Sequence, residues 1–242
     1  MLLAGPGRRR AAPRRPGYPR EVATHGSCKP GGSRVWLFDL DNTLHQATPH
    51  IFPHINRSMT EYIERHLGVD PHEATRIRQD YWVRYGATLL GLTRHHGTDP
   101  DHFLRETHQF PDLQRMVVFE RPVIHALHRL PGRKIIFSNA PRHYTEAILQ
   151  ITGLGPCFDA VYSVENVRYQ PKPMLSGFRA LLRAERLNPC RCIMVEDSLA
   201  NLVAAKKLGM KTVWVSTSYR QSPSVDVKIT SVMQLPGRCG RL

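Results

Sequence analysis

The sequence has few cysteines and no long apolar run, and both shortages restrict what the chain can be. Its 242 residues include five cysteines, an odd number, and none has the paired spacing of a zinc site. We therefore expect reduced thiols and a cytoplasmic location. No run of about 18 apolar residues occurs, so we expect no membrane-spanning helix. Residues 1–4 are too short for the apolar stretch of a secretory signal.

Acidic residues are also scarce, at 20 against 34 lysines and arginines, which gives a net charge of +14. Part of this excess lies in residues 1–33, where Glu21 is the single acid and large apolar side chains are few. Such a composition predicts a disordered tail. The tail could bind polyanions, act as a transit peptide, or precede a start codon further down. A solvated tail without a specific function is our first expectation.

What the chain does contain, from residue 34 onward, is a series of short apolar runs that read as buried strands. They are residues 35–38, 134–137, 160–163, 192–195 and 211–215. Helical patterns separate the last four runs. This alternation predicts an α/β fold with a doubly wound, Rossmann-like parallel sheet. Ligands of such folds bind at the carboxyl ends of the strands.

The first two runs lie about 95 residues apart, much further than one crossover helix requires. We expect an inserted helical unit at residues 47–118. Helix starts are indicated at Asp70, which is followed by proline and then by glutamate, and at Asp99, which is also followed by proline. The predicted α/β core then consists of residues 34–46 and 119–242.

A pair of acids, Asp39 and Asp41, follows the first predicted strand. Residues two apart in an extended strand point the same way, so the two carboxylates should repel each other. A bound divalent cation would relieve that repulsion. The alternative is a solvated turn, because an Asp-Asn pair is common in turns.

Other polar residues follow later strands. Ser138 and Asn139 end the second strand, where Asn139 could cap a helix whose N-terminus would bind phosphate. Glu196 and Asp197 end the fourth strand, and Lys172 lies between two prolines that restrict its backbone. Each has an ordinary alternative as a cap, a solvated acid or an exposed lysine. Their joint occurrence at successive strand ends favours a single site.

The order D-x-D-x-T, S-N, K-P and E-D-S resembles the four motifs of the haloacid-dehalogenase (HAD) superfamily. The resemblance implies that Asp39 is a covalent nucleophile and Asp41 a general acid and base, as in the phosphatases of that superfamily. It implies Mg²⁺ held by Asp39, Asp197 and the carbonyl of Asp41, with Glu196 supporting the metal from further out. One departure is Asn201, which stands where some members carry another acid. The same resemblance assigns phosphate binding to Asn42, Thr43, Ser138, Asn139 and Lys172.

Residues 80–92 and 164–173 resemble the corresponding segments of pyrimidine 5′-nucleotidases, in which a helical cap covers the active site. Tyr81, Tyr85 or Trp82 could stack on a base, or could pack the interior of the cap instead. His45 could line the entrance. The expected function is thus a Mg²⁺-dependent phosphomonoesterase that forms an aspartyl-phosphate and hydrolyses UMP or CMP.

Two other functions compete with this interpretation. The enzyme could act on a sugar phosphate or on phosphoglycolate, or the chain could be a nucleic-acid-binding protein that works through its basic tail. The first interpretation predicts a small-molecule phosphate monoester as the partner, with neither membrane nor nucleic acid involved. It leaves the oligomeric state open.

Overall fold

The computed structural model describes residues 33–242. The predicted disordered tail lies outside this range, apart from its last residue. Within it, no helix is both long enough and apolar enough to cross a lipid bilayer. Cys157, Cys192 and Cys239 are free thiols, as expected, whereas the expectation is wrong for Cys190, which is disulfide-bonded.

The core of the protein is a six-stranded sheet in which every neighbouring pair of strands is parallel. The spatial order β3-β2-β1-β4-β5-β6 confirms the predicted doubly wound topology, with β1 near the centre. The strands are β1 (Val35–Phe38), β2 (Arg133–Phe137), β3 (Ala160–Tyr162), β4 (Cys192–Glu196), β5 (Lys211–Val215) and β6 (Val227–Ile229). β6, an edge strand of three residues, was not among the predicted strands.

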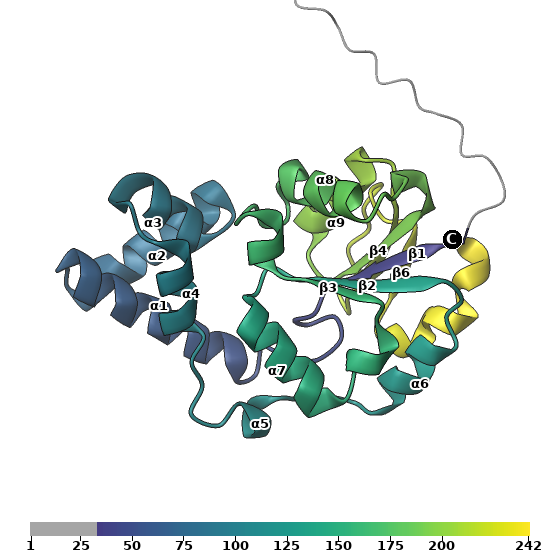
Figure 1. The fold of residues 1–242 in the computed structure, drawn as a ribbon, viewed down its shortest axis with the longest axis horizontal. Coiled ribbons are helices and arrows are strands. Elements are labelled where there is room, and N and C mark those ends of the chain that lie inside the picture. The colour runs from purple at the N-terminus through teal and green to yellow at the C-terminus, as the bar shows by residue number, and fades with distance from the viewer. Residues whose placement is uncertain (1–32) are drawn as a thin grey trace, which may run out of the picture.

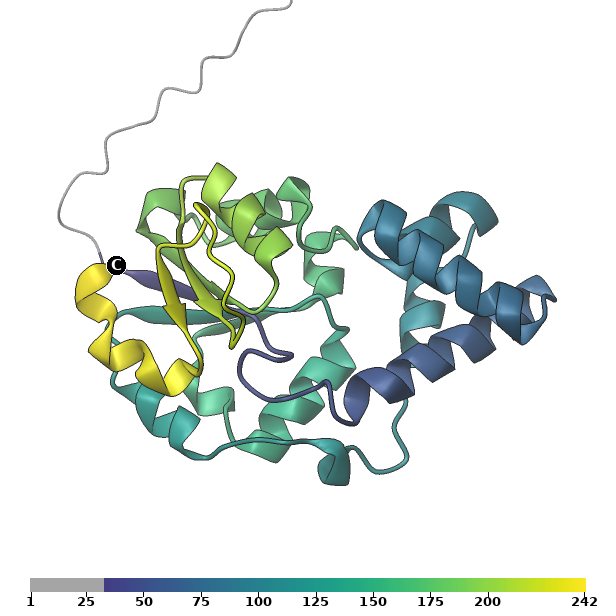
Figure 2. The same ribbon diagram turned by 180° about the vertical axis from the view of Figure 1, so that it is seen from behind.

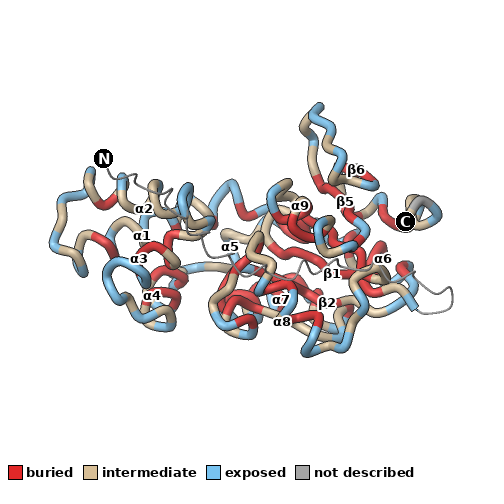
Figure 3. Tube along the Cα trace, turned by 90° about the horizontal axis from the view of Figure 1, so that it is seen from above, coloured by how far each residue is buried: buried red, intermediate tan, exposed pale blue. Residues whose placement is uncertain are grey.

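Side chains of β1 alternate between two apolar clusters, one on each face of the sheet. Trp36 and Phe38 join the cluster that includes α6 and α7, while Val35 and Leu37 join the cluster that includes α8 and α9. This is the period-two alternation of a strand that is covered on both sides. Figure 1 shows the helix pairs on opposite faces, and Figure 3 shows buried residues along the strands between them. The four helices are α6 (Pro122–His128), α7 (Arg142–Thr152), α8 (Leu175–Ala184) and α9 (Leu199–Lys207).

The chain between β1 and β2 is helical, and its first four helices stand to one side of the sheet (Figures 1 and 2). They share an apolar cluster of their own, built around Tyr62, Ile63 and Phe103. The predicted helix starts are confirmed: Asp70 accepts hydrogen bonds from two backbone N–H groups of its helix, and Asp99 accepts one. These helices are α1 (Ile51–Leu67), α2 (Pro71–Tyr85), α3 (Thr88–His96) and α4 (Pro100–Thr107), followed by α5 (Leu113–Met116).

Two contacts bring this helical group against the carboxyl edge of the sheet. Gly86, which ends α2 with a φ of 80°, lies so close to Pro173 that an added Cβ would be 3.6 Å from the proline ring. The Tyr169 hydroxyl donates a hydrogen bond to Asp101 of α4. Tyr169 and Pro173 both belong to residues 169–173, the segment around Lys172 that we call the lysine loop. The end of α2 and the start of α4 therefore lie beside the lysine loop.

Candidate active site

Asp39 follows β1 directly and points its carboxylate into the interior. Its backbone N–H still continues the sheet by donating to the carbonyl of Val195 at 3.0 Å. One carboxylate oxygen lies 2.7 Å from the Lys172 ammonium, and the other accepts from the Thr43 hydroxyl at 3.1 Å. Asp39 is buried and Lys172 is 1% exposed, so this ion pair is shielded from water. The end of β1 and the loop that precedes α8 thus bring together two charges that are 133 residues apart.

The Lys172 side chain is fixed at both ends. Asn139 holds its backbone in a two-bond clamp: the amide oxygen accepts from Lys172 N–H at 2.8 Å, and the amide nitrogen donates to Lys172 C=O at 2.9 Å. At the other end the ammonium also donates to Glu196 at 2.8 Å and to the carbonyl of Phe137 at 2.6 Å. All three protons of the ammonium therefore have acceptors.

The expectation that Asn139 caps a phosphate-binding helix is wrong. Helix α7 begins at Arg142 with Pro141 as its cap residue, and the Asn139 side chain is engaged by Lys172. The N–H of Arg142 donates to both carboxylate oxygens of Glu165, at 2.9 and 3.1 Å. An anion therefore already occupies this helix N-terminus. Ser138 is buried, and its hydroxyl accepts from the backbone N–H two residues on at 3.0 Å.

Three acids meet beside Lys172. Asp39, Glu196 and Asp197 each offer a carboxylate oxygen, and these atoms lie within 4.8 Å of one another. Three carboxylates against one ammonium leave the cluster short of positive charge, which a divalent cation with hard oxygen ligands would supply. The cluster includes Glu196, which the resemblance placed further out, and does not include the Asp41 carboxylate.

The pKa values of the three acids are all raised, chiefly by burial. Burial raises the pKa of Asp39 to about 7, with a further contribution from repulsion by Glu196. Burial also raises the pKa of Glu196 to about 7 against the opposing pull of Lys172, and it raises the pKa of Asp197. For Lys172, burial alone would lower the pKa, but attraction to Asp39 and Glu196 outweighs it and leaves the pKa raised. The lysine is therefore a permanent cation at neutral pH.

Asp41 faces a different set of partners. One of its carboxylate oxygens accepts from the Tyr144 hydroxyl at 2.5 Å and lies 2.9 Å from Nε2 of His45. His45 was expected at the substrate entrance, but its side chain is fully buried beneath Asp41. Tyr144 was not among the predicted site residues, although its place in the first turn of the helix after Ser138 and Asn139 is a usable signal.

The predicted phosphate-binding side chains divide into two groups. Thr43 and Lys172 lie against Asp39. Asn42, at a φ of 60°, turns its side chain into its own loop and accepts from the backbone N–H groups of residues 47 and 48 at 3.0 and 3.1 Å. Asn42 and Asn139 therefore shape the two loops, while Thr43 and Lys172 face the nucleophile.

The two tyrosines predicted to meet the substrate pair with histidines of α3. Tyr81 lies 2.8 Å from His96 and Tyr85 lies 2.6 Å from His95, measured from hydroxyl oxygen to Nε2. The Tyr81 ring also covers Gly91, where an added Cβ would come within 2.2 Å of it. Tyr81 thus has a packing role, whereas Tyr85 adjoins the glycine that touches the lysine loop.

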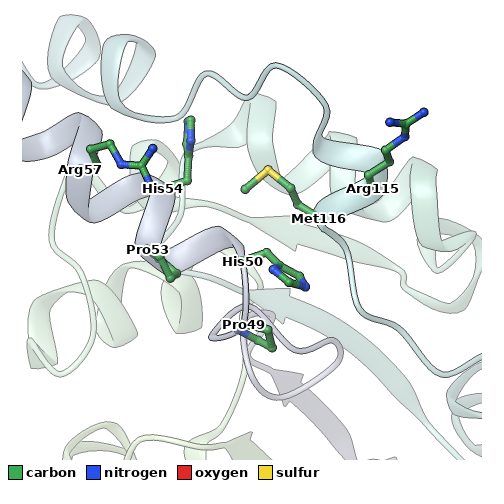
Figure 4. Close-up of a pocket in the computed structure, with 7 residues that line it drawn as sticks. All are labelled: Pro49, His50, Pro53, His54, Arg57, Arg115 and Met116. Atoms are coloured by element: carbon green, nitrogen blue, oxygen red, sulfur yellow. The ribbon is translucent and has the colours of Figure 1, made fainter.

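A surface pocket of about 380 Å³ lies at the start of α1 (Figure 4), next to the chain that leads into the helical group. Its lining residues are Pro49, His50, Pro53, His54, Arg57, Arg115 and Met116. A second cavity of similar size lies between α4 and α7 and is lined on both sides by charged side chains, including Arg105, Arg142 and Glu146. Neither lining includes a member of the acid cluster.

Comparison with known proteins agrees with this geometry. The family model for haloacid dehalogenase-like hydrolases matches residues 34–209. Phosphate metabolism protein 8 of Saccharomyces cerevisiae is 24% identical over 194 residues, which cover 73% of this chain and 60% of the yeast protein. The chain therefore matches less than two thirds of that relative. Validoxylamine A 7′-phosphate phosphatase of Streptomyces hygroscopicus subsp. limoneus is 25% identical over 194 residues, covering 77% and 87%.

Solved structures show the same fold. The HAD phosphatase from Thermococcus onnurineus superposes with a TM-score of 0.60 at 23% identity, over 86% of this chain and 98% of its own. CbbY from Rhodobacter sphaeroides, in complex with phosphate, gives 0.58 at 21% identity over 84% and 96%. Because the family model covers most of the chain and the motif residues meet at one edge of the sheet, this protein belongs to the haloacid dehalogenase-like hydrolases.

Proposed function

We propose that the chain is a Mg²⁺-dependent phosphomonoesterase that forms a covalent phosphoryl intermediate on Asp39. The observation that carries the proposal is the pairing of two unlike carboxylates. Asp39 is buried against the Lys172 ammonium, whereas Asp41, two residues on, is hydrogen-bonded by neutral or titratable groups. Two carboxylates in different environments can take different roles, one as nucleophile and the other as acid and base.

The chemistry follows from these positions. Asp39 attacks phosphorus in line, the bond to the leaving oxygen breaks, and Asp41 protonates that oxygen. In the second step Asp41 takes a proton from water, which attacks the phosphoryl group and releases Asp39. Lys172 and Thr43, already within hydrogen-bond distance of Asp39, would hold phosphoryl oxygens. Ser138, at the end of the next strand, would complete the phosphate seat.

Mg²⁺ fits the donor set, which consists of hard oxygens with an excess of negative charge. Asp39, Asp197 and the main-chain carbonyl of Asp41 would hold the ion, with Glu196 in the same cluster. When bound, the cation cancels the repulsion between the incoming phosphate and the carboxylates.

We propose further that residues 47–118 form a cap over a core of residues 34–46 and 119–242, and that the cap selects the substrate. The contact between Gly86 and Pro173 supports this division of labour, because it sets the end of α2 beside Lys172. Tyr85, the residue before that glycine, is the better of the two tyrosines for stacking on a base. The proposed substrates are pyrimidine nucleoside 5′-monophosphates, UMP or CMP.

A sugar phosphate or phosphoglycolate is the second candidate, and the names of the relatives favour it. They include validoxylamine A 7′-phosphate phosphatase, the hexitol phosphatase B of Escherichia coli, which is 28% identical over 105 residues, and the phosphoglycolate phosphatase of Pseudomonas putida, which is 22% identical over 213 residues. The chemical steps on Asp39 and Asp41 are the same for either substrate class.

A substrate panel tests the proposal. The full chain would be assayed with Mg²⁺ for phosphate release from UMP, CMP, AMP, a hexose 6-phosphate, 2-phosphoglycolate and p-nitrophenyl phosphate. We expect kcat/KM for UMP or CMP to exceed the other natural esters by at least about tenfold, which is about 1.4 kcal/mol in the barrier. If a hexose phosphate or phosphoglycolate gave the highest kcat/KM, that ester would replace the nucleotide as the proposed substrate. The proposed phosphatase activity would stand. No release from any ester would contradict the proposed function itself.

A further inference from the structure

We propose that Tyr144 and His45 are positioning residues that hold one oxygen of Asp41, so that the other oxygen handles the proton of the reaction. This inference rests on the proposed function, because it assigns the control of the general acid and base. Neither residue belongs to the D-x-D-x-T, S-N, K-P or E-D-S motifs.

Both partners meet the same carboxylate oxygen. Oδ1 of Asp41 accepts from the Tyr144 hydroxyl at 2.5 Å and lies 2.9 Å from Nε2 of His45. A carboxylate oxygen has two lone pairs, so two donors fill the capacity of Oδ1. When Asp41 is a carboxylic acid, its proton must then lie on Oδ2. The Asp41 side chain keeps 16% of its surface exposed, while those of its two partners are buried.

The second ring nitrogen of His45 supports a donor role for Nε2. Nδ1 is buried and has no hydrogen-bond partner among the described residues. A proton on Nδ1 would be a buried donor without an acceptor, and Nε2 would then face the carboxylate with a lone pair. A proton on Nε2 instead makes a charge-assisted hydrogen bond to Asp41. A proton on Nε2 is therefore favoured.

Both positioning residues lie in rigid surroundings. His45 comes four residues after Asp41, and the two residues form a backbone bridge. Tyr144 lies in the first turn of α7, is 1% exposed, and packs against Phe110, with ring centres 5.5 Å apart. Asp41 itself lies in a loop beyond the end of β1, where a short side chain would otherwise rotate freely. The two hydrogen bonds restrict that rotation and fix where Oδ2 lies.

The proton balance of the two steps follows. As the phosphorus–oxygen bond breaks, the leaving oxygen keeps the electron pair and takes the proton from Oδ2 of Asp41. The resulting negative charge on Asp41 is stabilised by the donors at Oδ1. In the second step Oδ2 removes a proton from the attacking water, which restores the acid. Tyr144 and His45 keep their protons throughout, so their contribution is to orientation and charge stabilisation.

The leaving group provides a test that a merely structural role would not pass. p-Nitrophenolate is a weak base and leaves with little help from an acid, whereas phenolate needs the proton. We would measure single-turnover release of p-nitrophenol and of phenol from the two aryl phosphates by Tyr144→Phe, with enzyme in excess. We expect at least about a tenfold loss for phenyl phosphate and less than about threefold for p-nitrophenyl phosphate, because general acid catalysis contributes about 10²- to 10⁴-fold.

Tyr162→Phe is the matched control. The Tyr162 hydroxyl also donates to a carboxylate, that of Glu185, at 2.6 Å, and it also lies on the core rather than on the helical group. The Tyr162→Phe variant should lose comparable stability, and its change in single-turnover rate should not differ between the two esters. Equal losses on both esters in Tyr144→Phe, or the same leaving-group difference in Tyr162→Phe, would overturn the proposal.

A pair of substitutions at His45 gives an independent test should Tyr144→Phe fold poorly. His45→Leu removes the donor, while His45→Gln keeps an N–H at a similar reach. The proposal predicts the leaving-group difference in the first variant and its recovery in the second; the same behaviour in both would refute it. Asp39→Asn distinguishes a failure of the proposed function from a failure of the positioning role. If that variant keeps full turnover, the proposed function fails, whereas a failure of the Tyr144 test with inactive Asp39→Asn overturns only the positioning role.

Discussion

The carboxyl edge of the sheet and the helical group α1–α4 use polar side chains in opposite ways. At the sheet edge, Asp39, Lys172 and Glu196 are buried and share charges that do not balance. In the helical group, Tyr81 and Tyr85 form hydrogen bonds with histidines near the surface. The proposed catalytic residues thus lie where the loss of one ion-pair partner would leave another charge buried and unpaired. The helical surface can change at lower cost, which is compatible with its proposed role in substrate selection.

The largest effect should come from Asp39→Asn, which changes the buried charge cluster at the sheet edge. The amide is no nucleophile, so turnover should fall by more than about 10³-fold. The fold should persist, because the pKa of the Asp39 carboxyl is raised chiefly by burial and next by Glu196, and a neutral side chain removes that penalty. Phosphate release and thermal unfolding would be measured without metal. Turnover within about tenfold of wild type would contradict the role of Asp39.

Removal of divalent cations should abolish turnover reversibly, since the same cluster lacks positive charge. After dialysis against EDTA we expect no phosphate release, recovery with Mg²⁺, and inhibition by Ca²⁺, which does not keep the octahedral geometry that Mg²⁺ demands. Thermal unfolding should shift upward when Mg²⁺ is returned, because ligands that bind only the folded state stabilise it. Full activity in EDTA would count against the whole mechanism.

His108 extends the comparison to the segment that joins α4 to the core. Burial lowers its pKa to about 4, with a further contribution from His143 and an opposing one from Asp41. The folded state therefore resists protonation that the unfolded chain accepts from about pH 6.5 downward. Stability should fall by up to about 3 kcal/mol between pH 6.5 and pH 4, at about 1.4 kcal/mol per pKa unit.

Urea unfolding at several pH values would measure this fall in stability at low pH, which is the acid limb of the pH–stability curve. His108→Asn keeps a polar atom near the Thr107 hydroxyl, which lies 3.0 Å from Nδ1 of His108, and removes the titration. The limb should be shallower in that variant and unchanged in the exposed control His72→Asn. An equally steep limb in His108→Asn would show that other groups cause it.

The smallest expected effect lies on the exposed side of the comparison. Tyr85→Ala should lower kcat/KM for UMP or CMP about tenfold more than for p-nitrophenyl phosphate, because base stacking is worth about 1–3 kcal/mol. Trp82→Ala, which truncates a neighbouring aromatic ring that is 64% exposed, is the control. Equal losses on both esters, with a fall in stability, would assign Tyr85 to packing and leave the phosphatase proposal standing.

The sequence by itself determined the sheet and the position of the acids along it. Apolar runs that end beside Asp39 and Glu196 are local patterns, and parallel strands carry their carboxyl ends to one edge, so the meeting of these two acids follows from strand order. The edge strand β6 was not predicted, because a lysine separates its two apolar residues and no continuous apolar run marks it.

Only the tertiary structure decided which polar atom faces which. Asn139 looks like a helix cap in the sequence, but its partner is the backbone of Lys172, 33 residues away. Tyr144 reaches Asp41 across 103 residues, and His45 turns inward beneath the same carboxylate. The physical reason is that a side-chain hydrogen bond forms only where donor and acceptor come within about 3 Å of each other. Local propensity determines the conformation of each segment, whereas the packing of α7 against the sheet determines the distance between the segments.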